Sequence, residues 1–235
     1  MQLSKRLQLV ASFVSEGQKM ADIGTDHGYV PVYLVQEKKV PYAYACDVNK
    51  GPLERAGFHI KEAGLQGQIE TRLGSGLSVL QPGEAQSVVI AGMGGPLMVR
   101  LLEERADVVA QVTELILSPH SEIDTVRRYL HAHGFAIVRE EMVLDEGKFY
   151  TVMKAVPGQE TNYTETEYRY GRHILQTAEP VFGAYLSDCI RKLTNLQAQL
   201  QGTGYPAAKE KLAQVETELE QVRVLYTKLY EREKR

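Results

Sequence analysis

The segment Asp-Ile-Gly-Thr-Asp-His-Gly, residues 22–28, constrains the fold more than any other part of this chain. It follows a strand-like run, residues 20–23, and its two glycines stand where a side chain would keep a ligand away from the backbone. Pro31 then suits the first turn of a helix that we expect to begin near His27. This order of strand, glycine turn and helix is typical of the first βα turn of a nucleotide-binding sheet.

A further carboxylate follows at the spacing that nucleotide-binding folds use for the ribose. The alternating run 42–46 is typical of the next strand, and it ends at Asp47, about twenty residues beyond the turn. In such folds an acidic side chain at this point accepts hydrogen bonds from the ribose hydroxyls. The glycine turn and Asp47 together predict a ligand that carries an adenosine.

Two carboxylates within the turn narrow the class of ligand. The glycines do not follow the G-x-G-x-x-G pattern, so the turn gives little support to a bound pyrophosphate. Asp22 and Asp26 would repel a diphosphate, but they suit a ligand with an ammonium and a sulfonium, such as S-adenosylmethionine. We therefore favour a methyltransferase over a nicotinamide dehydrogenase. Asp26 has a second interpretation, as the N-cap of the helix that begins at His27, and the two roles can coexist.

The composition is that of a globular α/β protein. The 235 residues allow one α/β domain with an appendage, or two small domains, and 43% of them are hydrophobic. No apolar stretch has the length of a membrane span and no signal-peptide core follows Met1, so we expect a cytoplasmic protein without a membrane partner. Cys46 and Cys189 lie too far apart for a C-x-x-C site, so neither a disulfide framework nor a bound metal is expected. The net charge of −3 argues against a broadly basic coat for nucleic acid.

Strands and helices alternate as far as Gly134, and then the pattern changes. Residues 135–144 and 149–156 are two strand-like runs joined by Asp-Glu-Gly-Lys, which predicts a hairpin. By analogy between folds, methyltransferase sheets insert an antiparallel last strand, whereas dinucleotide folds continue with βα units. The expected fold class is therefore α/β, with a Rossmann-like methyltransferase sheet that ends in an antiparallel strand.

The C-terminal part has a helical pattern only. Apolar residues recur there at spacings of three and four on either side of the segment 202–206, which predicts an antiparallel coiled-coil hairpin. They are Phe182, Leu186, Cys189, Leu193, Leu196 and Leu200, then Leu212, Val215, Leu219, Val222, Tyr226 and Leu229. We expect a methyltransferase domain at 1–157 and a helical domain at 158–235. Each residue of these stripes is best explained by packing between the helices. The hairpin as a unit could bind a substrate or a second subunit, and we expect a monomer or a weak homodimer.

Several short motifs occur in one order along nearly the whole chain, at residues 3–7, 22–28, 45–49, 73–77, 90–95 and 147–150. In these motifs the chain resembles the bacterial tRNA (adenine-22-N1)-methyltransferase family. The resemblance implies a class I S-adenosylmethionine fold followed by a helical coiled-coil domain. It also implies S-adenosyl-L-methionine as cofactor, tRNA as partner and methyl transfer to N1 of an adenine.

The resemblance suggests which residues bind the cofactor: Arg6, Asp22, Gly24, Thr25, Asp26, His27, Gly28, Asp47, Val48, Ser75, Gly76 and Ala91. Arg6 is the candidate for the methionine carboxylate, because a guanidinium binds a carboxylate with two hydrogen bonds. The alternative is a solvated helix charge. Ser75 departs from the acidic or amide residue expected there, although its hydroxyl can still accept a hydrogen bond from the adenine amine.

The segment 91–94, Ala-Gly-Met-Gly, stands where enzymes that methylate the exocyclic amine of adenine often carry Asn-Pro-Pro-Tyr. It has no amide side chain, but its glycines let a base approach the backbone. Ring nitrogen N1 already has a free lone pair, so a general base is optional. The catalytic candidates are Asp26, which would stabilise the cationic product, Gly92 and Met93. The candidates for contact with the target base are His27, Tyr29, Met93 and Gly94, although an aromatic at position 29 more often packs in the core.

Three groups of basic residues are candidates for contact with RNA phosphates: Lys38 and Lys39; Arg127, Arg128, His131 and His133; and residues 232–235. Charged runs on helices are more often solvated faces. Two further functions stay open from the sequence. One is methyl transfer to another RNA or to a small molecule, and the other is a non-catalytic RNA-binding module.

Overall fold

The computed structural model describes residues 2–201 and 206–231. The chain divides into two compact units, Met1–His173 and Ile174–Arg235. Residues just beyond the predicted domain boundary at 157 pack with the first unit, because the Arg127 guanidinium donates hydrogen bonds to the carbonyls of Tyr168 and Arg169. The compact units thus divide later in the chain than the predicted domains 1–157 and 158–235.

A seven-stranded sheet forms the centre of the first unit, in the order β3-β2-β1-β4-β5-β7-β6. The strands are β1 (Met20–Ile23), β2 (Ala43–Asp47), β3 (Ile69–Leu73), β4 (Ser87–Ala91), β5 (Glu114–Ser118), β6 (Phe135–Asp145) and β7 (Lys148–Pro157). The first five strands are parallel, while β7 runs antiparallel to both β5 and β6. The predicted Rossmann-like sheet with an antiparallel terminal strand is confirmed.

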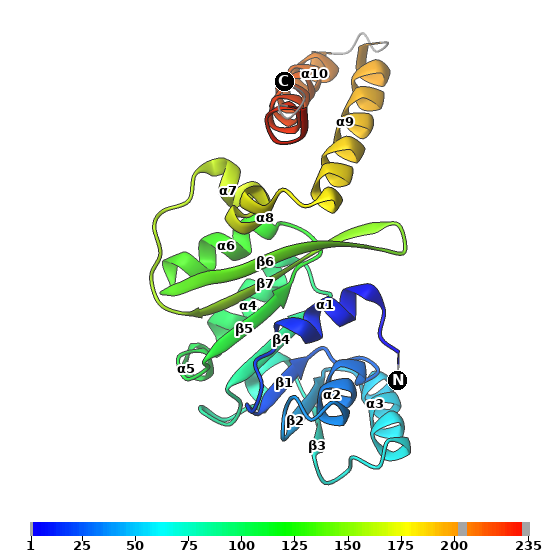
Figure 1. Cartoon of the computed structure of the whole chain (residues 1–235), viewed down its shortest axis with the longest axis vertical. Coiled ribbons are helices and arrows are strands. Elements are labelled where there is room, and N and C mark those ends of the chain that lie inside the picture. The colour runs from blue at the N-terminus through cyan, green and yellow to red at the C-terminus, as the bar shows by residue number, and fades with distance from the viewer. Residues whose placement is uncertain (1, 202–205, 232–235) are drawn as a thin grey trace. The chain divides into compact units, whose positions relative to one another are not determined.

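Helices cover both faces of this sheet (Figure 1). The helical elements before the C-terminal hairpin are α1 (Lys5–Phe13), α2 (Tyr29–Gln36), α3 (Lys50–Glu62), the 3₁₀ turn η1 (Gly76–Val79), α4 (Gly95–Glu104), α5 (Ala106–Val109), α6 (Ile123–Ala132), α7 (Glu165–Tyr170) and α8 (Arg172–Thr177). Apolar side chains of α1, α2 and α3 pack on one face, and those of α4, α5 and α6 pack on the other. Successive residues of β4 alternate between the two layers, since Val89 joins the first and Val88 and Ile90 join the second. A strand buried on both faces explains the continuous apolar run.

The first βα turn differs in detail from its prediction. The helix α2 begins at Tyr29, not near His27, and its N-cap is Gly28, which has a φ of 71°. Asp26 makes no capping hydrogen bond to this helix, so its interpretation as the N-cap is wrong. The turn closes by a hydrogen bond of 3.0 Å from the Gly28 amide to the Thr25 carbonyl. Because the left-handed backbone at Gly28 belongs to the turn, the helix starts one residue after the second glycine.

The second unit is a helical hairpin of α9 (Pro180–Gln201) and α10 (Pro206–Tyr226), followed by a π-helical turn, η2 (Thr227–Glu231). The two long helices pack along one another. The buried members of their predicted apolar stripes are Phe182, Leu186, Val215, Leu219 and Val222. The predicted C-terminal hairpin is confirmed, and its apolar stripes form the contact between the helices.

Candidate cofactor and acceptor site

A cavity of about 380 Å³ lies in the first unit, at the carboxyl ends of β1, β2 and β3 and beside α4. Its walls are Ile23, Gly24, Cys46, Asp47, Val48, Asn49, Gly74, Ser75, Gly76, Met93, Leu97, Arg100 and Leu101. A cavity of this size suits a small molecule, and this edge of a doubly wound sheet is where such folds bind their ligands. The predicted cofactor residues Gly24, Asp47, Val48, Ser75 and Gly76 are among those that line it.

Asp22 lies just below this edge, at the end of β1, and only 5% of it is exposed. The Thr25 hydroxyl donates a hydrogen bond of 2.7 Å to its carboxylate. Burial, with a contribution from the negative charge of Asp47, raises the pKa of Asp22 to about 6, although the Thr25 hydrogen bond and the charge of Arg6 oppose the rise. A buried carboxylate with so little compensation is suited to a cationic ligand.

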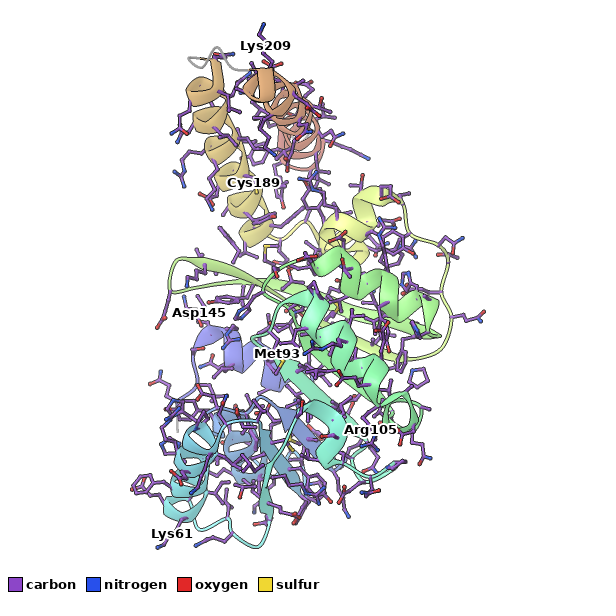
Figure 2. All side chains as sticks on the ribbon, turned by 180° about the vertical axis from the view of Figure 1, so that it is seen from behind. Lys61, Met93, Arg105, Asp145, Cys189 and Lys209 are labelled. Carbon is purple, nitrogen blue, oxygen red and sulfur yellow. The ribbon has the colours of Figure 1, made fainter. Side chains whose placement is uncertain are left out.

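Gly24 and Met93 hold two loops of the site against each other. Gly24 has a φ of 77°, and a Cβ at this position would lie 2.5 Å from the terminal methyl of Met93. The positive φ disfavours a side chain there, and the Met93 methyl occupies the space beside Gly24, so the turn after β1 and the loop after β4 meet through this contact. Figure 2 labels Met93, which joins the cavity to the predicted acceptor segment 91–94.

Asp47 ends β2 with its carboxylate at the cavity wall. Only 8% of the residue is exposed, and its two oxygens accept hydrogen bonds from the amides of Asp26, at 3.2 Å, and Asn49, at 2.8 Å. These two amides fix the direction of the carboxylate and leave lone pairs for further donors. Hydroxyl groups of a ribose are donors of the required kind, so the observed residues fit an adenosine-bearing cofactor with a positive charge.

The rest of the turn lies outside the cavity wall. Asp26 is exposed with a φ of 51°, and its carboxylate pairs with Arg55 at 3.1 Å and with His27 at 3.6 Å. The rings of His27, Tyr29 and His59 contact one another, with centroids 5.1 Å apart for His27–Tyr29 and Tyr29–His59 and 5.9 Å apart for His27–His59. Tyr29 is partly buried against the core, as its structural interpretation expects. Of Asp26, His27 and Tyr29, none lines the cavity.

Arg6 enters the site from α1. Its guanidinium lies 3.3 Å from His120 Nε2 and 5.1 Å from the centre of the Tyr150 ring, and its backbone amide donates to Asp145. Asp145, the last residue of β6, is labelled in Figure 2. These contacts hold the side chain in place, so the interpretation of Arg6 as a solvated helix charge is wrong. Its role toward the methionine carboxylate stays a prediction.

Sequence reasoning missed several residues at this edge. His120 lies beside Gly92, the Tyr150 ring lies against His120, and Asn49, Leu97 and Arg100 line the cavity. For Tyr150 a signal was present, because it ends one of the motifs that carry the family resemblance, but no role was assigned to it. For His120 the signal was its place directly beyond a buried strand. The α4 residues gave no signal beyond the helical pattern.

The predicted basic clusters are mostly occupied by internal partners. Arg127 is buried in an ion pair with Glu140, Arg128 pairs with Glu165, and His131 Nε2 lies 2.7 Å from Glu160 Oε1. Lys39 donates to backbone carbonyls of α1. These four cations therefore have partners within the fold, and the contact of the clusters around residues 38 and 127 with RNA phosphates stays a prediction. Residues 232–235 lie outside the described part of the chain.

Among residues 2–201 and 206–231, no helix combines the length and the apolar character that a membrane crossing requires. The same part of the chain has no group of three or more histidine, cysteine or acidic side chains placed to hold a metal ion.

The chain is similar to known methyltransferases. Residues 3–153 match the family of methyltransferase domains. The tRNA (adenine(22)-N(1))-methyltransferase of Bacillus subtilis (strain 168) is 39% identical over 158 residues, a match that covers 67% of this chain and 66% of that protein.

Two solved structures share the fold over almost the whole chain. The B. subtilis m1A22 tRNA methyltransferase TrmK has a TM-score of 0.84 at 30% identity, and the match covers 96% of this chain and 99% of that one. Streptococcus pneumoniae Sp1610, solved with S-adenosyl-L-methionine, has a TM-score of 0.83 at 33% identity, with 96% and 100% covered. The chain therefore belongs to the methyltransferase-domain family and, within it, to the tRNA (adenine-22-N1)-methyltransferases.

Proposed function

We propose that this protein transfers the methyl group of S-adenosyl-L-methionine to N1 of adenine 22 in tRNA. The observation that carries the proposal is the cavity at the carboxyl edge of the sheet, where Asp47 lies in the wall and Met93 connects it to the glycine segment after β4. The contact between Gly24 and Met93 thus joins the cavity proposed for the methyl donor to the segment proposed for the acceptor base. Family membership supports the choice of acceptor.

Different residues around the cavity would bind different parts of the cofactor. Asp47 would hold the ribose hydroxyls, and the buried carboxylate of Asp22 would attract the ammonium. Val48, Ser75 and Gly76 line the other side of the cavity, where the adenine would bind. Thr25, Gly28 and Ala91 act through the backbone at the turn and at the end of β4. When bound, the cofactor supplies an electrophilic methyl group.

The chain's own task in the reaction is alignment. The nucleophile is the N1 lone pair of the target base, so no side chain has to remove a proton first. Gly92 is exposed with a φ of 95°, and it lets a planar base approach the backbone beside Met93. The base becomes a cation as it receives the methyl group, and Asp26, in the turn after β1, would stabilise that charge. His27, Tyr29, Met93 and Gly94 would pack around the base.

The acceptor is tested with labelled cofactor and two unmodified tRNA transcripts, one with adenine and one with guanine at position 22. We expect label in the first transcript only, because guanine carries a proton on N1 and has no free lone pair there. Equal labelling of both transcripts would support another RNA position. Label in neither transcript, with intact cofactor binding, would favour a small-molecule acceptor, and absence of cofactor binding would favour a non-catalytic RNA-binding module.

The raised pKa of Asp22 predicts a pH-dependent affinity for the cofactor. Since this pKa is about 6, against an ordinary 3.8, part of the carboxyl groups are protonated at pH 6 and cannot attract the ammonium. We expect cofactor affinity to fall as the pH drops from 7 through about 6, and binding near pH 6 to release protons. Calorimetry in buffers of different ionisation enthalpy measures both effects.

Asp22→Asn is the matched control, because its amide oxygen can still accept the Thr25 hydrogen bond. Its affinity should be lower and should not change between about pH 5 and 7. The same group affects stability without cofactor: its contribution to folding is fully present below pH 3.8 and is lost as the pH rises through about 6. A wild-type affinity that does not vary over this range would contradict the role of Asp22.

The proposed substrate also bears on the location and the assembly of the protein. A protein that modifies tRNA works where tRNA is found, so we propose a cytoplasmic location. The methyltransferase domain at 1–157 would carry the chemistry, and the helical domain at 158–235 would bind tRNA or a second subunit. Sedimentation of the protein with and without tRNA distinguishes these roles, because a monomer or weak homodimer is expected in the absence of RNA.

A further inference from the structure

Arg6 and His120 meet beside Gly92, and the ring of Tyr150 lies against both of them. Arg6 Nη1 lies 3.3 Å from His120 Nε2, and the rings of His120 and Tyr150 have centroids 5.4 Å apart. A Cβ built on Gly92 would lie 3.5 Å from Arg6 Nη1 and 3.7 Å from His120 Cε1. A base that lies against Gly92 therefore meets these side chains directly.

His120 presents a lone pair at this place. A guanidinium only donates hydrogen bonds, so the contact with Arg6 requires Nε2 to be the accepting nitrogen of a neutral imidazole. Burial lowers the pKa of His120, and the positive charges of Arg6 and Lys148 lower it further. At neutral pH the ring is thus an acceptor at Nε2 and a donor at Nδ1.

The backbone fixes His120 relative to the donor cavity. The His120 amide donates a hydrogen bond of 2.8 Å to the carbonyl of Met93, whose side chain lines the cavity. The Gly92 amide donates in turn to the carbonyl of Ser118, at the end of β5. The loop after β5 is therefore tied to the loop after β4, and the His120 ring is carried beside the point where donor and acceptor would meet.

We propose, resting on the function proposed above, that His120 accepts a hydrogen bond at Nε2 from the exocyclic amine of the target adenine. In the reaction the N1 lone pair forms a bond to the methyl carbon, the carbon–sulfur bond breaks, and its electron pair stays on sulfur. The base gains a positive charge and no proton has to move. Because a cationic base donates more strongly through its amine, the bond to His120 strengthens as the methyl group is transferred.

The same lone pair would distinguish adenine from guanine. Adenine offers an amine at C6, whereas guanine offers a carbonyl oxygen, whose lone pairs would face that of Nε2. Arg6 can give up its contact at 3.3 Å at low cost, because it also lies against the Tyr150 ring and interacts with the charge of Asp22. The incoming amine would take the place of one Arg6 N–H.

The test is a thermodynamic cycle in which the His120 side chain and the exocyclic amine of the target base are removed separately and together. Single-turnover methylation rates and tRNA dissociation constants are measured at saturating cofactor, with transcripts that carry adenine or unsubstituted purine at position 22. Purine lacks the amine, and its lower intrinsic reactivity at N1 cancels when two enzymes are compared. The enzymes are wild type, His120→Ala, His120→Gln, which keeps an acceptor oxygen, and Glu54→Ala, which removes an exposed side chain of α3.

We expect loss of the amine to slow the wild type about tenfold more than His120→Ala. His120→Gln should recover part of this difference, and Glu54→Ala should behave as wild type. An equal effect of the amine in wild type and His120→Ala would overturn the role of His120 while leaving the proposed function intact. If the wild type does not methylate the adenine transcript at all, the proposed function fails first and the inference fails with it.

Discussion

Replacement of Asp47 by alanine should raise the dissociation constant of S-adenosylmethionine about thirty- to hundredfold, which corresponds to about 2–3 kcal/mol. Asp47 lines the cavity at the end of β2, where nucleotide-binding folds place the acceptor for two ribose hydroxyls. Hydrogen bonds to a buried carboxylate are among the stronger ones in proteins, and alanine removes both. Calorimetric titration of the cofactor measures the change.

Two controls separate loss of the ribose contacts from damage to the turn. Asp47 also accepts hydrogen bonds from the amides of Asp26 and Asn49, so the thermal midpoint of Asp47→Ala is measured beside its affinity. Glu54→Ala removes an exposed carboxylate from neighbouring α3, where Glu54 pairs with Lys50 at 3.5 Å, and it should bind as wild type. An unchanged affinity in folded Asp47→Ala would mean that the ribose is held elsewhere.

Removal of the Arg127 charge should destabilise the protein by about 3–5 kcal/mol. Arg127 is 1% exposed and Glu140 2%, with 2.7 Å between the Arg127 Nε and the Glu140 Oε1. Arg127→Met leaves the carboxylate buried without its cation, and it also removes the donors to the carbonyls of Tyr168 and Arg169. Urea denaturation of the full-length variant, compared with the wild type, measures the loss of unfolding free energy.

The adjacent arginine provides a matched control. Arg128 and Glu165 have side chains that are 45% and 84% exposed, so Arg128→Met should cost less than about 1 kcal/mol. The double variant Arg127→Met/Glu140→Leu should recover a part of the stability, because it removes both buried charges, but not all of it, because the two carbonyls lose their donors. Equal losses in Arg127→Met and Arg128→Met would contradict the assignment of Arg127 to the core.

The elements that depend on local pattern could be predicted from the sequence. The turn 22–28, the strand that ends at Asp47 and the buried run of β4 each combine apolar periodicity with glycine or an acidic residue at a fixed offset. The antiparallel β6–β7 pair followed from the loss of alternation and a four-residue turn. These signals are local, and the fold follows from them because the carboxyl ends of parallel strands share one edge.

The contacts made across the fold could not be predicted in this way. Helical spacing places Arg127 on the apolar side of α6, four residues after Ile123 and three before Leu130. Its partner Glu140 could not be predicted, because it comes from a different element, β6. No role was predicted for Tyr150, because β7 is antiparallel and the beginning of this strand, not its end, lies at the edge where the parallel strands end. The start of α2 was placed too early because the turn takes up Gly28 as well.

The most direct test of the account identifies the methylated nucleoside and its position. Unmodified tRNA is incubated with the protein and S-adenosylmethionine, digested to nucleosides and to fragments, and analysed by mass spectrometry against N1-methyladenosine and N6-methyladenosine standards. The account predicts N1-methyladenosine, in the fragment that contains position 22. N6-methyladenosine, a methyl group at another position, or no methylation by protein that binds the cofactor would contradict it.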